Sequence, residues 1–524
     1  MISAILFISF FVFLILGLPI AICLGLSSVC AILYSGTSLT IVATNMYSGI
    51  SKFLLLAIPF FVLSGNIMAK AGISTRLIRF VDTCVGHRKG GIANVCIIVA
   101  CFFGAISGSG PATVAALGAV LIPAMVERGG FSAPFSTALM ATASSIAIVI
   151  PPSIAFVVYA SITGVSIGDM FMAGIVPGIL MGLALIVVVM LEVRKNHVVP
   201  SNVQKASAKE RLDAFKDAFW GFLMPVIILG GIYGGIFTPT EAAAVSVVYG
   251  LFVGMVIYKE VKLKDLWDIL IDSAKTTGGI MLIVACASLF SFVCTRFGIS
   301  AAASQLLAKV AGNQFTFLLI CNVIFLIAGC FIDANSAMYI FIPIMLPVCK
   351  QLGYNVIAFG IMATVNLAIG QVTPPVGVNL FVAIGVKLKN GLQVTLQQIS
   401  RAVVPMVAAC IVVLLMITYI PGISTFLPAA LGSAAAVENG TTTGGDSGTT
   451  ATDNDDFNTI EDYSDLDWPE MTWNFTCSTT ETSTWAQAGR KFGELMEQAT
   501  GGKIKVEVYA ADQLTGGNQS EGIQ

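Results

Sequence analysis

The sequence is poor in charged residues. Asp, Glu, Lys and Arg make up only 11% of its 524 residues, whereas 56% are hydrophobic and the mean hydropathy is +0.89. Soluble domains carry about a quarter charged residues, so most of this chain cannot be a soluble domain. Apolar runs long enough to cross a hydrocarbon core recur from residue 1 to about residue 431. The sequence therefore predicts an all-α polytopic membrane protein.

The motifs of several reaction classes are also missing. The chain has two histidines, no C-x-x-C pair, no H-E-x-x-H and no phosphate-binding G-x-x-x-x-G-K-[ST] loop. Metalloproteases, redox proteins and ATP-driven pumps depend on such patterns. We therefore expect that the protein is not an enzyme and needs no cofactor. If it transports a solute, an ion gradient must supply the driving force.

Lysine and arginine gather in three polar segments, Lys70–Lys89, Arg194–Lys216 and Lys259–Lys275. The positive-inside rule places all three segments in the cytoplasm. Three full crossings between the first two segments would contradict that rule. The contradiction disappears if residues 93–125 form a re-entrant hairpin that enters and leaves on the cytoplasmic side.

A second hairpin, over residues 315–349, would then open from the opposite side. The C-terminal tail becomes external, in agreement with the lack of Lys and Arg from 402 to 489. Residues 2–35 are predicted to form two short spans separated near Gly17–Pro19, with an external N-terminus, or else one tilted span.

The chain contains an internal repeat. The stretch "LIPAMVERGG…LMATASSIAIVIPPSIAFVV" from Leu121 aligns with "MLPVCKQLGY…IMATVNLAIGQVTPPVGVNLFV" from Met345, at an offset of 222 to 224 residues. Repeat 1 covers about 2–191 and repeat 2 about 217–421. Because the two hairpins open in opposite directions, we expect an inverted repeat, which is typical of secondary transporters.

Adjacent prolines interrupt both copies within apolar sequence. Proline removes a backbone donor and clashes with the preceding turn, and the carbonyls that this frees survive at membrane depth only beside a protected cavity. The freed carbonyl oxygens could bind a cation such as sodium, which prefers oxygen ligands. The N-termini of half-helices could bind a carboxylate. The predicted sodium site is Ser107, Ser109, Asp333, Asn335, Ser336, Thr373 and Gly377, and the predicted substrate site is Pro152, Ser153, Pro374 and Asn379.

Each assignment has a structural alternative. Small residues such as Ser107 also pack helices, Asp333 could form a structural pair, and paired prolines could simply kink a helix. Glu241 is interpreted as a helix cap. Asn66 and Asn366 are interpreted as packing hydrogen-bond partners, and Arg296 and Lys309 as residues of an external loop.

Five motifs in this order resemble the large membrane subunit of the tripartite ATP-independent periplasmic (TRAP) transporters, the DctM-like family. They are "GSGPATVAALG" (108–118), "IPPSIAFVVYA" (150–160), "FTPTEAAAVSVVYG" (237–250), "IDANSAM" (332–338) and "VTPPVGVNLF" (372–381). The resemblance implies sodium-driven import of organic acid anions by an elevator movement across the bacterial inner membrane. It also implies a small DctQ-like membrane subunit and a DctP-like extracytoplasmic binding protein.

The C-terminal region has a different composition. Residues 433–467, after the transporter domain (1–432), form a predicted disordered acidic linker. Residues 468–524 indicate a strand, an amphipathic helix near 484–500 and a second strand. This segment resembles the start of a DctP-like α/β binding domain, so we expect a tethered, truncated binding domain.

Two other functions are compatible with parts of the sequence. A carboxylate symporter without a binding protein would share the repeats but would have no use for the tail. A membrane-anchored solute receptor or sensor would use the tail but would need no repeated hairpins.

Overall fold

The computed structural model describes residues 1–196, 205–386, 394–431, 471–477, 484–500 and 502–510. The chain divides into two compact units, residues 1–441 and 442–524. The first unit is helical throughout its described residues, and eight of its helices are long and apolar enough to cross a membrane. This agrees with the polytopic helical class that the composition predicts.

The helices of the first half begin with three short elements and end with one long helix. They are α1 (Ile2–Ile15), α2 (Ile20–Tyr34), α3 (Thr40–Ile50), α4 (Ala57–Lys70), α5 (Ile73–Val85), α6 (Gly91–Ser107), α7 (Gly110–Glu127), α8 (Ala133–Ser145), α9 (Ile154–Thr163) and α10 (Ile167–Lys195), with 3₁₀ turns η1 (Phe53–Leu56) and η2 (Ile146–Ile148).

The second half presents a similar succession of helices. They are α11 (Ala208–Tyr233), α12 (Pro239–Phe252), a π-helical turn η3 (Val253–Ile257), α13 (Leu263–Arg296), α14 (Ile299–Ala311), α15 (Gln314–Phe331), α16 (Ala334–Gln351), α17 (Val356–Gly370), α18 (Val378–Ile384), α19 (Leu396–Tyr419) and α20 (Gly422–Ala430).

Glycines in the left-handed region mark the same joints in the two halves. Gly72 precedes α5 and Gly298 precedes α14, with φ of 69° at both. Gly90 (φ 71°) follows α5 and Gly312 (φ 63°) follows α14. Gly130 (φ 67°) and Gly353 (φ 68°) follow α7 and α16 in the same way. Residues with a Cβ avoid this conformation. The repetition seen in the sequence thus extends to the backbone at the ends of the helices.

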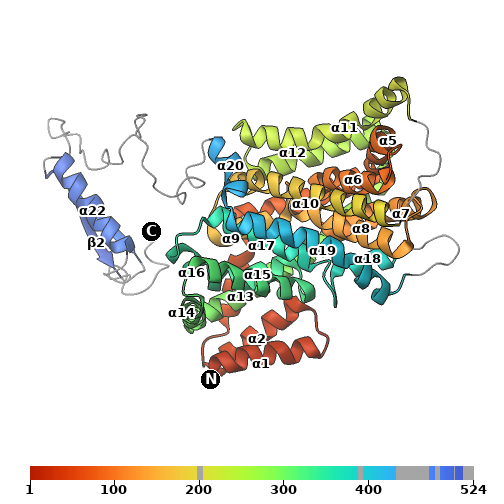
Figure 1. The fold of residues 1–524 in the computed structure, drawn as a ribbon. Coiled ribbons are helices and arrows are strands. Elements are labelled where there is room, and N and C mark those ends of the chain that lie inside the picture. The colour runs from red at the N-terminus through yellow and green to blue at the C-terminus, as the bar shows by residue number, and fades with distance from the viewer. Residues whose placement is uncertain (197–204, 387–393, 432–470, 478–483, 501, 511–524) are drawn as a thin grey trace, which may run out of the picture. The chain divides into compact units, whose positions relative to one another are not determined.

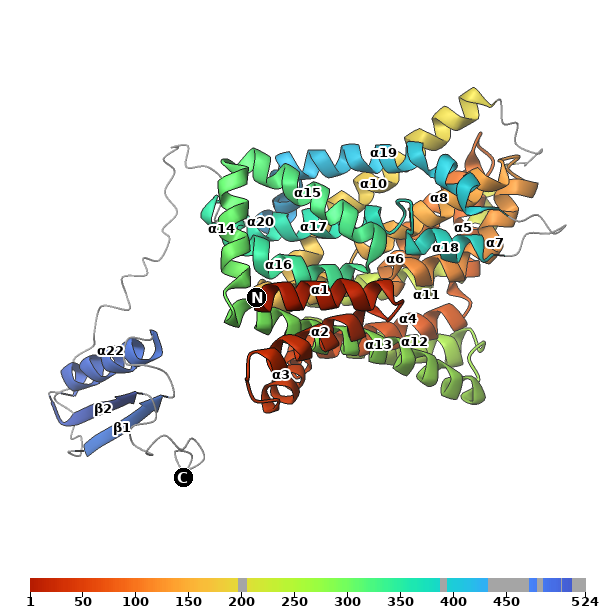
Figure 2. The same ribbon diagram turned by 90° about the horizontal axis from the view of Figure 1, so that it is seen from below.

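By their contacts, the helices of the first unit fall into two groups. Figure 1 shows α11 and α12 along one side of the first unit and α1 and α2 along the other, with α6, α8, α10 and α19 between them. The pairs α6–α7 and α15–α16 pack with α8, α10, α17 and α19, whereas α4 packs with α12, and α13 packs with α2 and α3. Helix α5 contacts both α6 and α11, and α14 contacts α13, α15 and α16. Figure 2 shows α14 lying crosswise to α15 and α16. Helices α5 and α14 therefore connect the group that carries the paired helices to the other group.

The sequence interpretation missed these two connecting helices. Residues 70–89 read as a basic loop and Lys309 as part of an external loop, but α5 and α14 occupy these stretches. Helix α5 is amphipathic, with Ile73, Leu77 and Val81 buried at a four-residue spacing. The loop interpretation was wrong because an amphipathic helix can have the same charge content as a polar loop and differs from it in the helical spacing of its apolar residues.

The second unit holds β1 (Met471–Cys477), α22 (Thr484–Ala499) and β2 (Ile504–Ala510). The strands pair in parallel, with Met471 opposite Ile504 and Cys477 opposite Ala510. The predicted strand–helix–strand order is confirmed for these residues. The predicted linker at 433–467 lies outside the described residues.

Candidate functional site

Four helix interruptions meet near the centre of the first unit. Helices α6 and α7 are separated by Gly108 and Ser109, and α15 and α16 by Ile332 and Asp333. The other two interruptions, between η2 and α9 and between α17 and α18, contain the Pro151-Pro152 and Pro374-Pro375 pairs, both with cis peptide bonds. The interruptions predicted from glycine and proline are therefore present.

Glycines let each paired helix approach one of the proline-interrupted helices. A Cβ built on Gly104 of α6 would lie 2.6 Å from the Cα of Ala147, and one on Gly370 of α17 would lie 2.5 Å from the Cα of Gly329. The Gly377 amide donates a hydrogen bond to the Cys330 carbonyl at 3.2 Å. Each interruption is therefore in close backbone contact with the paired helix of its own half.

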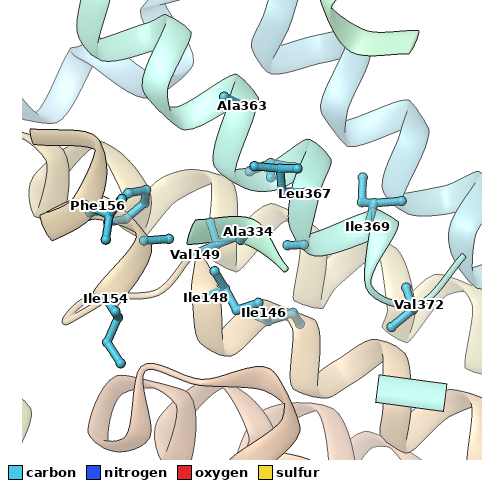
Figure 3. Close-up of a cluster of buried hydrophobic side chains, with 14 of the residues drawn as sticks. Ile146, Ile148, Val149, Ile154, Phe156, Ala334, Ala363, Leu367, Ile369 and Val372 are labelled. Atoms are coloured by element: carbon cyan, nitrogen blue, oxygen red, sulfur yellow. The ribbon is translucent and has the colours of Figure 1, made fainter. Parts of the chain in front are cut away.

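Apolar side chains of the two halves pack together at the site, and two of them, Ile148 and Ala334, line the cavity described below. Ile148, Val149 and Phe156 of the first half gather with Ala334, Leu367 and Ile369 of the second (Figure 3). All of these side chains are at least 95% buried. The interruptions of the two halves therefore share one hydrophobic cluster.

A cavity of about 360 Å³ opens where the interruptions meet. The tips of both helix pairs line it, through Ser109 and Pro111 in the first and Asp333 and Asn335 in the second. Gln371, at the start of the α17–α18 interruption, and Lys275 and Thr276 of α13 complete its polar lining. A smaller hollow of about 140 Å³ is lined by Ser107, Ser109, Asn66 and Thr276. Ser109 and Thr276 border both.

Three buried amide oxygens in this region lack a hydrogen-bond donor among the described residues. They belong to Asn335, Gln371 and Asn379. A Cβ built on Gly110 would lie 3.1 Å from the Asn379 oxygen and 3.2 Å from the Gln371 oxygen, so both amides face the α6–α7 tip. The Asn379 nitrogen donates to Ser144 Oγ at 3.3 Å. Buried polar atoms are normally satisfied, and oxygens left without donors suit a hard cation.

Asp333 is the N-cap of α16. One carboxylate oxygen accepts hydrogen bonds from the Asn335 and Ser336 amides at 3.0 and 3.1 Å, and the other accepts from the Ser336 hydroxyl. The carboxylate also lines the cavity. Asp333 therefore has a structural role that the sequence left open, in a position where a cation could also reach it.

The remaining predicted residues do not line the 360 Å³ cavity, although Ser107 lines the smaller hollow. The Ser107 hydroxyl lies 2.8 Å from that of Thr113, and the Thr373 hydroxyl donates to the Ile369 carbonyl at 2.8 Å. Ser153 is buried and donates to the Ile148 carbonyl. Pro152 contributes a carbonyl oxygen that a Cβ on Gly108 would approach to 2.8 Å. Pro374 is in the interruption but is not among the residues that line the cavity.

The structure adds residues that the sequence did not single out as ligands. Gln371 sits one residue past α17, and its polarity within an apolar run was a usable signal. Lys275 and Thr276 belong to α13, and Lys275 read as part of a basic cytoplasmic segment. Lys275 is highly exposed, with Asp272 at 3.8 Å, so its charge faces water and the cavity together.

Three side chains interpreted as structural have structural contacts. Glu241 and Thr238 form a reciprocal capping box at the start of α12. The Asn66 amide donates to Ser273 Oγ at 2.8 Å, and the Asn366 amide donates to Asn322 Oδ1 at 2.8 Å. Among the described residues, no group of three or more His, Cys, Asp or Glu side chains could hold a metal ion.

The comparisons with known proteins agree on one family. Residues 7–423 match the family model described as "Tripartite ATP-independent periplasmic transporter, DctM component". The C4-dicarboxylate TRAP transporter large permease protein DctM of Rhodobacter capsulatus is 39% identical over 432 residues, which are 79% of this chain and 96% of that protein. The isethionate TRAP transporter permease protein DctMQ of Oleidesulfovibrio alaskensis is 42% identical over 418 residues, or 80% of this chain and 65% of that longer protein.

The fold also resembles a solved structure with little sequence identity. The Alcanivorax borkumensis YdaH transporter superposes with a TM-score of 0.53 at 14% identity, covering 75% of this chain and 88% of that one. The family match ends before the second unit, so it gives no support to a fused binding domain. Over residues 7–423, this chain belongs to the DctM family of TRAP transporter large permeases.

Proposed function

We propose that the protein is the large membrane subunit of a sodium-driven importer of organic acid anions in the bacterial inner membrane. Its expected partners are a small DctQ-like membrane subunit and a DctP-like binding protein. Two of the relatives are named for C4-dicarboxylates and isethionate, which are small organic anions. Carboxylates and sulfonates of this size could enter a cavity of about 360 Å³.

The single observation that carries sodium coupling is the set of amide oxygens without donors. Asn335, Gln371 and Asn379 all belong to the second half of the chain, and the oxygens of Gln371 and Asn379 face Gly110 of the first half. We place the proposed sodium site there. Further oxygen ligands of the ion would come from Ser107, Ser109, Asp333, Ser336, Thr373 and Gly377. The substrate is proposed to lie between the two interruptions, near Pro152, Ser153, Pro374 and Asn379.

The movement that we propose is an elevator displacement of the group that contains α6–α10 and α15–α20. In this proposal α6–α7 and α15–α16 are re-entrant hairpins that open on opposite faces of an inverted repeat. The short breaks at Gly108–Ser109 and Ile332–Asp333 support that reading. Helices α5 and α14, which contact both groups, would connect the moving part to the fixed part.

The second unit enters the proposal as the beginning of a tethered binding domain on the external side. The parallel β1–β2 pair and the intervening α22 support this part of the proposal. Parallel strands joined through a helix are the basic element of α/β binding domains.

Sodium should bind to the purified protein without any substrate. A ligand at 100 times its Kd stabilises the native state by about 2.7 kcal/mol. We therefore expect the melting temperature to rise with sodium chloride but not with potassium chloride, as measured by tryptophan fluorescence. Uptake of candidate organic acids into sealed vesicles, with sodium and proton gradients imposed separately, completes the test. Uptake that follows the proton gradient and ignores sodium would refute the coupling.

Lys275 should strengthen the binding of the substrate anion when the site is open to the cytoplasm. Its ammonium is exposed and lines the cavity from α13, and exposed charge pairs contribute up to roughly 1 kcal/mol. In inside-out vesicles, Lys275→Gln should weaken substrate affinity by up to about fivefold and leave sodium stabilisation unchanged. Lys264→Gln, an exposed lysine on the same helix that does not line the cavity, is the control. Equal affinities in both variants would remove Lys275 from the substrate path.

A further inference from the structure

A larger cavity, of about 600 Å³, lies between α10 and α19 and shares no lining residue with the cavities of the candidate site. Its walls are apolar and are formed by Leu183, Val187, Leu191, Ala409, Val412 and Met416. The two helices pack side by side (Figure 1). Both are long and apolar enough to cross a membrane. We call this cavity the α10–α19 groove.

The walls of the groove are open to the surroundings of the helices. Val187 is 55% exposed and Val412 is 58% exposed. In a membrane span such side chains face hydrocarbon, and a groove of this volume is within the range of small-molecule sites. The body of the groove therefore suits an acyl chain.

One end of the groove is rich in positive charge. Helix α10 ends at Arg194 and Lys195, and Lys195 lines the groove together with Pro405. Arg401 precedes Pro405 by one turn of α19. None of these three cations has an ion pair among the described residues. Glu192 also lines this end, and its carboxylate accepts a hydrogen bond from Asn196 at 2.6 Å.

Three cations against one carboxylate leave this end net positive. It belongs to the side of the protein that the positive-inside rule assigns to the cytoplasm. A neutral lipid or an apolar helix would fill the groove but leave the cations without a counter-charge. Basic pockets between membrane helices on this side recognise anionic headgroups.

We propose that the α10–α19 groove binds one anionic phospholipid of the cytoplasmic leaflet. An acyl chain lies along Val187 and Val412, and the phosphate is held by Lys195 and Arg401. The bound lipid contacts two helices that pack on the elements of the candidate site, α19 on α8 and α10 on α6. The proposal does not require sodium coupling or any particular substrate.

Retention of added lipid by the purified protein tests this assignment. Native mass spectrometry in a neutral detergent compares phosphatidylglycerol with phosphatidylcholine at equal concentrations. The wild type should retain phosphatidylglycerol at about 25-fold lower concentration, since each of the two cations near the headgroup is worth about a factor of five. The double variant Lys195→Gln/Arg401→Gln should lose this preference. Lys264→Gln, which removes one exposed lysine outside the groove, should behave as the wild type does.

A second variant tests the groove itself independently of its charge. Val187→Trp fills the groove at an exposed position, so it should fold and yet retain less of both lipids. Val412→Trp, on the opposite wall, should act in the same way. Equal retention of the two lipids by the wild type would overturn the proposal. So would an unchanged preference in the charge variant, or full retention in both tryptophan variants.

Discussion

Replacing Gly370 with alanine should destabilise the protein and lower transport at least tenfold. The new Cβ would lie 2.5 Å from the Cα of Gly329, and neither backbone can move without shifting its helix. Overpacking of this kind costs about 1–3 kcal/mol. The measurements are the melting temperature in detergent and the initial uptake rate in vesicles.

Gly230→Ala is the matched control. Gly230 also lies inside a helix, α11, but a Cβ there would meet no atom within 4 Å. Alanine in a helix interior is favoured over glycine by about 0.5–1 kcal/mol, so this variant should be at least as stable as the wild type. If Gly370→Ala matched Gly230→Ala in both measurements, the close contact between α15 and α17 would not be needed.

Replacing Asp333 with asparagine should raise the sodium concentration needed for half-maximal uptake about tenfold, which corresponds to 1.4 kcal/mol. Asparagine caps a helix about as well as aspartate does, so the start of α16 should remain intact. The substitution removes the negative charge and replaces the oxygen that accepts from the Ser336 hydroxyl with an amide nitrogen, which can donate to that hydroxyl instead. The alanine variant should lose the cap as well, at a cost of about 0.5–2 kcal/mol in stability.

The variant Asn355→Ala distinguishes the effect of losing a helix cap from an effect on sodium coupling. Asn355 caps α17 by accepting hydrogen bonds from the Ile357 and Ala358 amides at 2.9 and 3.0 Å, and it does not line the cavity. This variant should lose stability, as Asp333→Ala does, but keep the sodium dependence of the wild type. An unchanged sodium dependence in Asp333→Asn would reduce Asp333 to a helix cap.

The interruptions of the helices could be predicted from local sequence. Glycine at 108 and the proline pairs at 151 and 374 act within one turn of their own positions, and the same is true of the break at Gly17–Pro19 that separates α1 from α2. Local chemistry also predicts that Glu241 caps α12. Such features need no knowledge of tertiary packing.

Partners that are distant in sequence could not be predicted in this way. The approach of Gln371 and Asn379 to Gly110, and the presence of Lys275 at the cavity, depend on how whole helices pack. Composition gave no sign of these contacts. Asp333 shows a further limit, because the sequence left open a sodium ligand or a structural pair and did not predict the helix cap that it forms.

The paired left-handed glycines at the ends of α5 and α14 have a mechanical consequence. Gly72 and Gly90 place a permissive backbone joint at or near both ends of α5, and Gly298 and Gly312 do the same for α14. A stiff rod with a pivot at each end transmits displacement while its own hydrogen bonds stay intact. If the two helix groups move relative to each other, the change in backbone dihedral angles would be confined to these four glycines. The packed interiors of the two groups would not have to change.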